Sequence, residues 1–420
     1  MAISIPHQSK QNGTYQRRNI TQSKPSLSSI NENEKQLSNT VNKPPKQHKS
    51  RTALQRCKRF ATKNTWATPL ALLLSISSLY AVNPTESNIL HHFIFLSYKE
   101  PSNVSSQNAK PQYGKGPWDL AFVLFYTIVL SFTREFVMQE LLRPLARKYI
   151  KTNGKQARFM EQAYTVIYFG ILGPAGLYVM RQTPVWYFNT QGMYEGFPHR
   201  THEASFKFYY LFEAAYWAQQ ALVMLLGLEK PRKDYYELVM HHIVTLVLIG
   251  LSYRFHFTYL GIGVYLTHDI SDFFLALSKS LHYIAPDYMI PFFATSIGAW
   301  VYLRHVLNLR ILYSLLNEFQ TVGPYELDWE TQQYKCWISN IITFGLLASL
   351  QCLNLFWLYC LLRSALRFLV TGDKKDDRSE PDESEIEAEA EKQILEEVNG
   401  HVALIGNGDV VSGKLNGASR

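Results

Sequence analysis

Residues 237–253 have the sequence ELVMHHIVTLVLIGLSY, a largely apolar stretch that contains two adjacent histidines. A helix needs about 20 mostly apolar residues to cross a hydrocarbon core of about 30 Å. The chain contains eight such apolar windows, including this one, at 66–82, 118–138, 163–180, 208–227, 237–253, 258–282, 290–316 and 338–362. Gly170, Gly173 and Pro174 interrupt the third window, which neighbouring helices can tolerate. The sequence therefore predicts an all-α, polytopic membrane helix bundle of about eight transmembrane helices.

The two ends of the chain differ from this apolar middle, which is why the mean hydropathy is only −0.13. Residues 1–65 contain thirteen Lys or Arg against two Glu, which predicts a disordered basic tail. Residues 371–420 begin with an acidic run and predict a second disordered tail. The net charge of +8 comes from basic residues that flank apolar segments. These residues indicate orientation in a membrane and argue against nucleic-acid binding.

The connecting segments predict which side of the membrane each loop occupies. Lys and Arg collect in residues 1–65, 139–162 and 228–236, which should therefore be cytosolic. The segments at 83–117 and 181–207 contain fewer basic residues, and 317–337 is acidic, so these should be lumenal. An even number of spans then places both termini in the cytosol.

Three short motifs outside the apolar windows suggest covalent modification. Asn103 begins an Asn-x-Ser sequon in the first predicted lumenal loop, where glycosylation can occur. Ser379 and Ser384 precede acidic residues in the C-terminal tail and are candidate phosphorylation sites. A solvated acidic tail is an equally good interpretation of the latter segment.

Two neighbouring predicted helices contain an unusual density of ionisable groups. His241, His242 and Thr245 lie in the fifth window, and the sixth contains His268, Asp269 and Asp272. Spacings of three and four place each set on one side of its helix. His241 lies eight residues from Lys233, or about 12 Å, and Asp269 lies ten residues from Lys279, or about 15 Å. The two sets should therefore meet at one level, in the cytosolic half of the membrane.

Three interpretations of this set are possible. An imidazole oriented by a carboxylate suits general-base or nucleophilic catalysis, for which acyl transfer is an appropriate reaction. His and Asp also bind iron or zinc, but membrane hydroxylases use many histidines in repeated boxes, and here the adjacent pair stands alone on its helix. Polar residues can also simply join helices. Because ionisable groups are costly inside a membrane, a functional site is the favoured interpretation, and no metal or other cofactor is expected.

The combined motif resembles the signature of the longevity-assurance ceramide synthases. The matching residues are Asp234 to Thr245, then Ser252, Tyr253, Gly261, and His268 to Asp272, ending at Lys279 and Tyr283. The HHxxT and HDxxD elements occur in the family's order and spacing, and the surrounding TLC-type domain would cover 158–370, preceded by an N-terminal transmembrane region at 66–157. The stretch Tyr253-Arg-Phe-His-Phe-Thr258 and the two charged tails are similar to the fungal members.

The resemblance implies acyl-CoA:sphingoid-base N-acyltransfer in the endoplasmic reticulum membrane, which makes ceramide. It implies that His241 and His242 are catalytic, with His268, Asp269 and Asp272 as the supporting set. For fungal members it further implies very long acyl chains, a small single-span accessory subunit, and assembly with a copy of the same or a paralogous synthase.

A consistent mechanism places the thioester among the helices, with its acyl chain directed toward the lumenal half and the CoA phosphates near the cytosolic basic edge. Lys230, Arg232 and Lys233 are candidate phosphate ligands. A histidine either removes the amine proton or first accepts the acyl group. Thr245 or His268 could donate a hydrogen bond to the oxyanion. The aspartates would orient imidazole N–H groups.

Two alternative functions stay open at this point. One is a non-enzymatic TLC-type lipid sensor or translocation helper, and the other is a metal-dependent lipid hydroxylase. Among the weaker candidates, Arg304 and Asn308 are expected to pair helices. An interfacial aromatic belt is predicted for Trp118, Trp186, Tyr187, Trp300 and Trp337.

Overall fold

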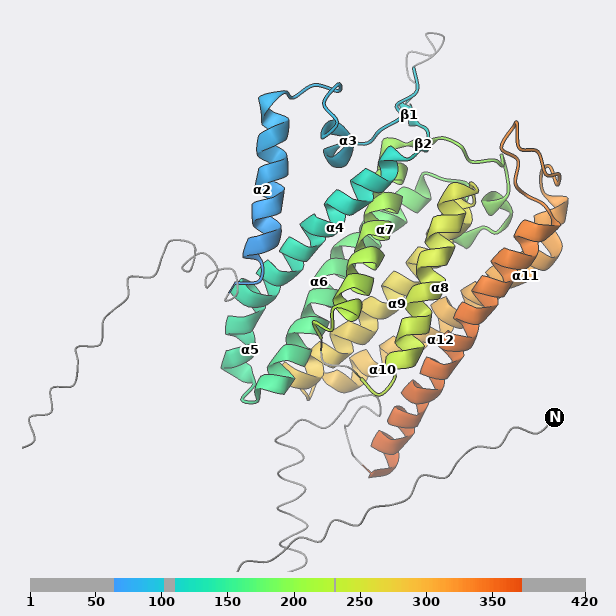
Figure 1. Cartoon of the computed structure of the whole chain (residues 1–420). Helices are drawn as coiled ribbons and strands as arrows, with labels where there is room; N and C mark the ends of the chain where they lie inside the picture. The colour runs from blue at the N-terminus through green and yellow to red at the C-terminus, as the bar shows by residue number, and fades with distance from the viewer. Residues whose placement is uncertain (1–63, 102–109, 230–231, 372–420) are drawn as a thin grey trace, which may run out of the picture. The chain divides into compact units, whose positions relative to one another are not determined.

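The computed structural model describes residues 64–101, 110–229 and 232–371, which belong to the second of two compact units of the chain, Ala53–Arg420. Within these residues the regular structure is helical apart from one short antiparallel sheet (Figure 1). The elements are, in order, α2 (Ala67–Val82), α3 (His91–Ile94), β1 (Gln112–Tyr113), α4 (Trp118–Phe136), η1 (Val137–Leu142), α5 (Arg143–Tyr149), α6 (Asn153–Arg181), η2 (Trp186–Phe188), η3 (Gln191–Met193), β2 (His202–Glu203), α7 (Ala204–Leu225), α8 (Tyr235–Arg254), α9 (Thr258–Ile284), α10 (Met289–Trp300), η4 (Val301–Leu307), α11 (Asn308–Thr321) and α12 (Trp337–Thr371).

Each of the eight predicted windows falls on helical structure. By length and composition, five helical stretches among the described residues can cross a membrane, at 118–149, 153–181, 235–254, 258–284 and 337–371. The predicted all-α membrane bundle is therefore confirmed, and the chain is a multi-pass membrane protein, whereas the number of eight spans is not established. The α2 helix is short, and Lys207 and Glu213 lower the hydropathy of α7.

Helix α6 packs against α9, the helix that contains the His/Asp motif (Figure 1). The expected interruption near Pro174 leaves α6 continuous from Asn153 to Arg181. Gly176 faces both α7 and α9, because an added Cβ would be 2.3 Å from Tyr209 Oη and 2.6 Å from Leu266 Cδ2. A glycine is therefore needed at this position for α6 to approach α7 and α9.

Two long helices contain one turn of π-helix each, η1 after α4 and η4 between α10 and α11. Such turns interrupt the regular hydrogen-bond ladder and often occur at functional sites. The η4 turn contains Arg304 and His305, both buried. It therefore directs two polar side chains inward at a point where the helix is irregular.

One end of the bundle is held by contacts between connecting segments. The β1–β2 ladder pairs Tyr113 with His202. In the segments beside it, Lys207 pairs with Asp119 at 2.6 Å, and Tyr253 donates to Asp119 at 2.7 Å. These contacts join the start of α4 to α7 and to the end of α8.

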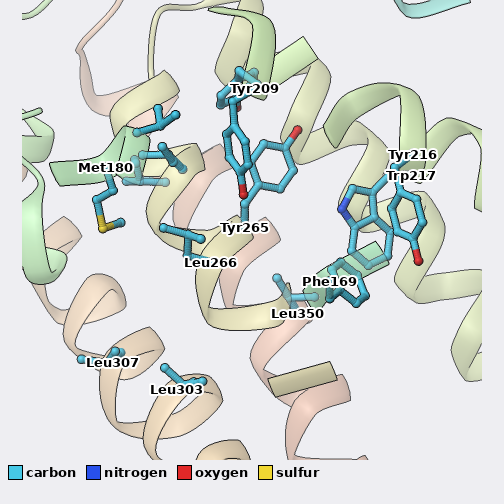
Figure 2. Packing of buried hydrophobic residues seen from close by; sticks show 14 of the residues in the cluster. Phe169, Met180, Tyr209, Tyr216, Trp217, Tyr265, Leu266, Leu303, Leu307 and Leu350 are labelled. Atoms are coloured by element: carbon cyan, nitrogen blue, oxygen red, sulfur yellow. The ribbon is translucent and has the colours of Figure 1, made fainter. Parts of the chain in front are cut away.

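Most of the buried apolar side chains form one cluster between the helices. Figure 2 shows part of this cluster, with Tyr209 and Trp217 from α7, Tyr265 and Leu266 from α9, and Leu350 from α12. The aromatic side chains of α7 therefore lie at the centre of the bundle, beside the helices that contain the predicted site.

Candidate active site

The structure brings the two predicted histidine sets together inside the bundle. His241 and His242 lie on α8, and His268 lies on α9, with ring centroids of His241 and His268 6.4 Å apart. All three imidazoles are buried, and Asp269 is fully buried. The spacing along the two helices therefore predicted correctly that these histidines lie at the same level of the bundle.

Two tryptophans that the motif does not contain enclose His241. The ring of Trp217, on α7, lies 5.7 Å from that of His241, and the ring of Trp357, on α12, lies 5.2 Å away on an edge-to-face approach. Trp357 Nε1 donates to Asp234 at 3.0 Å, which fixes its orientation. Sequence reasoning missed both residues. The available signal was a tryptophan inside an apolar window, central in the case of Trp217.

The hydrogen bonds of His268 define its protonation. Its Nδ1 lies 2.9 Å from the carbonyl oxygen of Val264 and therefore donates, while its Nε2 lies 3.2 Å from Asn354 Nδ2 and accepts. This pattern describes a neutral imidazole with both nitrogens engaged. Without rearrangement, His268 is therefore poorly placed to remove a proton from a substrate.

By contrast, three polar atoms of α8 are buried and make no hydrogen bond within the described part of the chain: His241 Nδ1, His242 Nδ1 and Thr245 Oγ1. Buried polar atoms are almost always paired, so such atoms need an explanation. A bound substrate would supply the missing partners.

Arg304 connects the supporting residues. Its guanidinium pairs with Asp272 at 2.6 Å and donates to Ser271 Oγ at 2.6 Å and to Asn354 Oδ1 at 3.1 Å. The same group lies 3.9 Å from the ring centroid of Trp300. The expected helix pairing by Arg304 is therefore observed, between η4, α9 and α12.

Both aspartates of the motif contact groups other than the paired histidines. Asp272 is held by Arg304, and Asp269 Oδ2 accepts from Tyr209 Oη at 3.4 Å. Within the described residues, neither carboxylate makes a hydrogen bond to His241 or His242. Any influence of Asp272 on the imidazoles is therefore indirect, through Arg304, Asn354 and His268.

The prediction of an aromatic belt is wrong for Trp300, which is only 2% exposed and covers Arg304. Trp118, Trp186, Tyr187 and Trp337 are exposed, as a belt requires. Trp300 differs because it stands next to the η4 turn, where its ring packs on a buried guanidinium.

Two cavities of different character meet at His241. The first has about 480 Å³ of space including its open side, and its walls are mostly apolar side chains of α8, α9 and α12. The second is larger and more polar, about 2020 Å³ including its open mouth, and is called the vestibule below. His241 and Trp217 line both cavities, whereas His242 lines only the vestibule.

The vestibule contains several basic residues together with two glutamates. Its charged lining residues are Arg134, Arg158, Arg232, Lys279, Arg304, Glu161, Glu229, Asp234 and Asp272. Of the predicted substrate ligands, Arg232 lines the vestibule and Thr245 lines the apolar cavity. Lys233 is exposed and lies outside the vestibule lining, and Lys230 falls outside the described residues. Arg158 and Lys279 were not predicted as ligands. Their helices, α6 and α9, are not consecutive in sequence, so only the tertiary structure shows that both line the same cavity.

Among the described residues, no group of three or more His, Cys, Asp or Glu is arranged to hold a metal ion. The predicted modification sites Asn103, Ser379 and Ser384 lie outside the described residues.

Comparison with known proteins gives a consistent result. A TLC domain matches residues 158–363. The sphingosine N-acyltransferase-like protein FUM17 of Gibberella moniliformis is 58% identical over 77% of this chain and 84% of its own length. The sphingosine N-acyltransferase lac1 of Schizosaccharomyces pombe is 48% identical over 78% and 84%. The ceramide synthase LAG1 of Saccharomyces cerevisiae is 47% identical over 77% and 78%.

Proposed function

The chain belongs to the TLC-domain ceramide synthases of fungal type, membrane enzymes that join a fatty acyl-CoA to a sphingoid base, and we propose that this transfer takes place at His241. The observation that supports this position is the meeting of the two cavities at His241. An acyl-CoA has a polar nucleotide at one end and an apolar chain at the other. A thioester beside His241 would have the vestibule on its polar side and the apolar cavity on its acyl side.

The reaction forms an amide bond from the sphingoid amine and the thioester carbonyl, releases CoA thiol, and requires removal of one amine proton. In one route, His241 accepts that proton as the amine attacks the carbonyl. In the other, His241 first attacks the thioester and then passes the acyl group to the amine. Both routes use an imidazole nitrogen that has no other hydrogen-bond partner. His241 Nδ1 meets this condition among the residues that the structure describes.

The supporting residues have distinct proposed roles. Thr245 Oγ1 has no hydrogen-bond partner within the described residues and lines the acyl cavity, so it suits donation to the oxyanion. His242 faces the vestibule, where it can contact the amine or the thiol. Asp269 and Asp272 are positioning residues, and Asp272 acts through Arg304 and Asn354 on His268.

The basic side chains of the vestibule are the proposed ligands of the CoA phosphates. Arg232, Arg158 and Lys279 line it from different segments of the chain. Guanidinium and ammonium groups bind phosphate by charge-assisted hydrogen bonds. In this arrangement the vestibule opens to the cytosol.

The cellular setting is proposed from the resemblance and from the distribution of charge. The enzyme acts in the endoplasmic reticulum membrane with both termini cytosolic, on very-long-chain acyl-CoA, and assembles with a small single-span subunit and a second synthase chain. Residues 158–370 form the catalytic membrane domain.

The test is ceramide formation from acyl-CoA and dihydrosphingosine in membranes of a host that lacks the activity. We expect activity with the wild-type chain and none with His241→Ala/His242→Ala. The matched control is Ile243→Ala on the same helix, because Ile243 is 51% exposed, and it should retain activity. Equal activity in the wild type and the double variant would disprove the proposed site. Absence of activity in the wild type, even with an accessory subunit, would instead favour the lipid-sensor alternative.

A further inference from the structure

Trp217 lines both cavities, as His241 does, so it lies where the polar and apolar ends of an acyl-CoA would meet. Its ring centroid is 5.7 Å from that of His241 and 6.1 Å from that of His242. The indole comes from α7, whereas both imidazoles come from α8. A group that reacts beside His241, at the boundary of the two cavities, would therefore also contact this indole.

The indole nitrogen of Trp217 is buried and has no hydrogen-bond partner among the described residues. The residue as a whole is only 7% exposed. In Figure 2 the nitrogen lies on the edge of the ring toward Tyr265, another residue that lines the apolar cavity. Buried N–H groups are almost always paired. A buried N–H beside a cavity that lacks a partner within the protein is suited to donate to a molecule bound in that cavity.

The chemistry of the indole restricts which atom that partner can be. The Nε1–H group is a neutral donor and never an acceptor. It therefore cannot accept a hydrogen bond from the ammonium form of a sphingoid base, and it can pair only with an acceptor. The acceptor closest to the reacting bond of an acyl-CoA is the thioester carbonyl oxygen, which is bonded to the carbon that the nucleophile attacks.

We infer that Trp217 is a further catalytic residue, whose indole N–H donates a hydrogen bond to the carbonyl oxygen of the acyl group. The inference rests on the proposed function, which places the thioester beside His241. When the nucleophile bonds to the carbonyl carbon, the π electron pair of the carbonyl moves onto oxygen, where Trp217 and Thr245 donate to it. The pair then re-forms the carbonyl as the carbon–sulfur bond breaks. Over the whole reaction, the CoA sulfur receives the proton that the amine loses.

Packing holds this donor in place before substrate binds. The Trp217 side chain belongs to the main apolar cluster, and its ring centroid lies 5.7 Å from that of Tyr216. A donor fixed in this way needs no reorganisation during the reaction, and its hydrogen bond strengthens as negative charge develops on oxygen. Loss of one such donor typically lowers kcat by about a hundredfold or more. KM changes little, because the bond acts mainly in the transition state.

Trp357 provides a matched control for Trp217. Its ring also lies against His241, at 5.2 Å between centroids, but its Nε1 already donates to Asp234 at 3.0 Å. Trp357 lines the vestibule and is not part of the apolar cavity's lining. The two tryptophans therefore share the contact with His241 and differ in whether the N–H is available to a substrate.

The experiment separates recognition of the carbonyl from packing, with two analogues of one acyl-CoA and the full-length protein purified in detergent. In the thioether analogue a methylene replaces the carbonyl, and in the ketone analogue a methylene replaces the sulfur, so only the ketone has an acceptor oxygen. Trp217→Phe should weaken ketone binding by about three- to tenfold, the net effect of one hydrogen bond, and should leave the Kd of the thioether unchanged. Trp357→Phe should leave the ratio of the two Kd values as it is in the wild type. In ceramide formation, Trp217→Phe should lower kcat by about a hundredfold or more at nearly constant KM.

Each outcome has a separate meaning. A Kd ratio in Trp217→Phe equal to that of the wild type overturns the inference and assigns the N–H to a buried water molecule. If Trp217→Phe binds neither analogue, it has failed to fold, and the same ratio is measured with 3-benzothienylalanine at position 217, in which sulfur replaces N–H in a ring of the same shape. An unchanged ratio there again overturns the inference. Absence of transfer by the wild type would refute the proposed function, whereas transfer by the wild type with an unchanged ratio refutes only the role of Trp217.

Discussion

His241 and His242 are adjacent in sequence but face different surroundings. Consecutive residues of a helix point about 100° apart, since a turn contains 3.6 residues. His241 therefore reaches both cavities and is enclosed by Trp217 and Trp357, while His242 lines the vestibule alone. The motif by itself did not distinguish the two histidines, but their surroundings do.

At the residue scale, we predict that single substitutions of the two histidines have unequal effects. His241→Gln should lower kcat by about a hundredfold or more, the usual effect of losing a positioned acid–base group. His242→Gln should lower kcat by only about tenfold. The effect is smaller because His242 contacts only the polar side of the reaction. The measurement is initial-rate kinetics on purified, equally expressed variants. Equal losses would contradict the assignment of the reacting position to His241.

Helix α6 shows how a single small residue sets the distance between elements. Gly173 and Gly176 lie three residues apart and both face α9, through Ile270 and Leu266 respectively, but of the two only Gly176 has no space for a methyl group. An added Cβ at Gly173 would lie 3.8 Å from Ile270, an ordinary contact. The two glycines therefore serve as a matched pair of positions at which the effect of an added methyl group can be compared.

At the element scale, we predict that Gly176→Ala destabilises the bundle and Gly173→Ala does not. Overpacking of this kind costs about 1–3 kcal/mol, and the displaced Tyr209 hydroxyl would also lose its contact with Asp269. Gly173→Ala should be neutral or should stabilise by up to about 1 kcal/mol through helix propensity. Thermal unfolding of the detergent-purified protein measures both. An unchanged midpoint in Gly176→Ala would show that α6 can move aside without cost.

The turn between α8 and α9 gives a second prediction at this scale. Burial, and to a smaller extent the nearby charge of Lys115, lowers the pKa of His256 to about 4. Burial also lowers the pKa of His199, likewise to about 4. A histidine in an unfolded chain has a pKa near 6.5. Protonation therefore favours a state in which this end of the bundle is opened and the imidazoles are exposed to water. The contribution of these neutral imidazoles to stability is fully present above about pH 6.5 and is lost as pH falls toward about 4.

Hydrogen exchange of the amides in residues 199–203 and 255–258 should therefore be faster at about pH 5 than at about pH 7.5, after correction for intrinsic rates. His256→Asn removes one of the titrating groups and tolerates the positive φ of 67° at this position. This variant should show a smaller pH effect. A pH effect of the same size in both proteins would exclude His256 as a cause.

For the whole molecule, the charge pattern predicts a single orientation in the membrane. The vestibule, with its basic residues, and both tails should face the cytosol, and the β1–β2 end should face the lumen. The sequence contains three Asn-x-Ser/Thr sequons, at Asn12, Asn19 and Asn103. Asn12 and Asn19 lie in the predicted cytosolic tail, whereas Asn103 lies in the segment that leads to β1, so only Asn103 should be glycosylated. Glycosidase treatment should shift the protein's mobility, and Asn103→Gln should abolish the shift. Asn12→Gln and Asn19→Gln are the controls, and a shift lost in either of them would reverse the predicted orientation.

The sequence by itself determined the positions of the helices and the identity of the polar set. Apolar length and helical spacing are local properties, so all eight windows fall on helices, and His241 and His268 lie at one level as the spacing predicts. The start of α6 at Asn153, ten residues before its window, was missed because the first turns of this helix are polar and leave no apolar signal.

Only the tertiary structure decided which side chains from distant helices meet. Trp217, Arg304 and the α12 residues Asn354 and Trp357 come from three elements, and their contacts with the motif depend on the rotation of each helix about its axis. The same is true of the two cavities, which exist only where several helix surfaces leave space between them. Spacing along one helix fixes which residues share a face, but the partner of that face is set by packing against residues that are far away in the sequence.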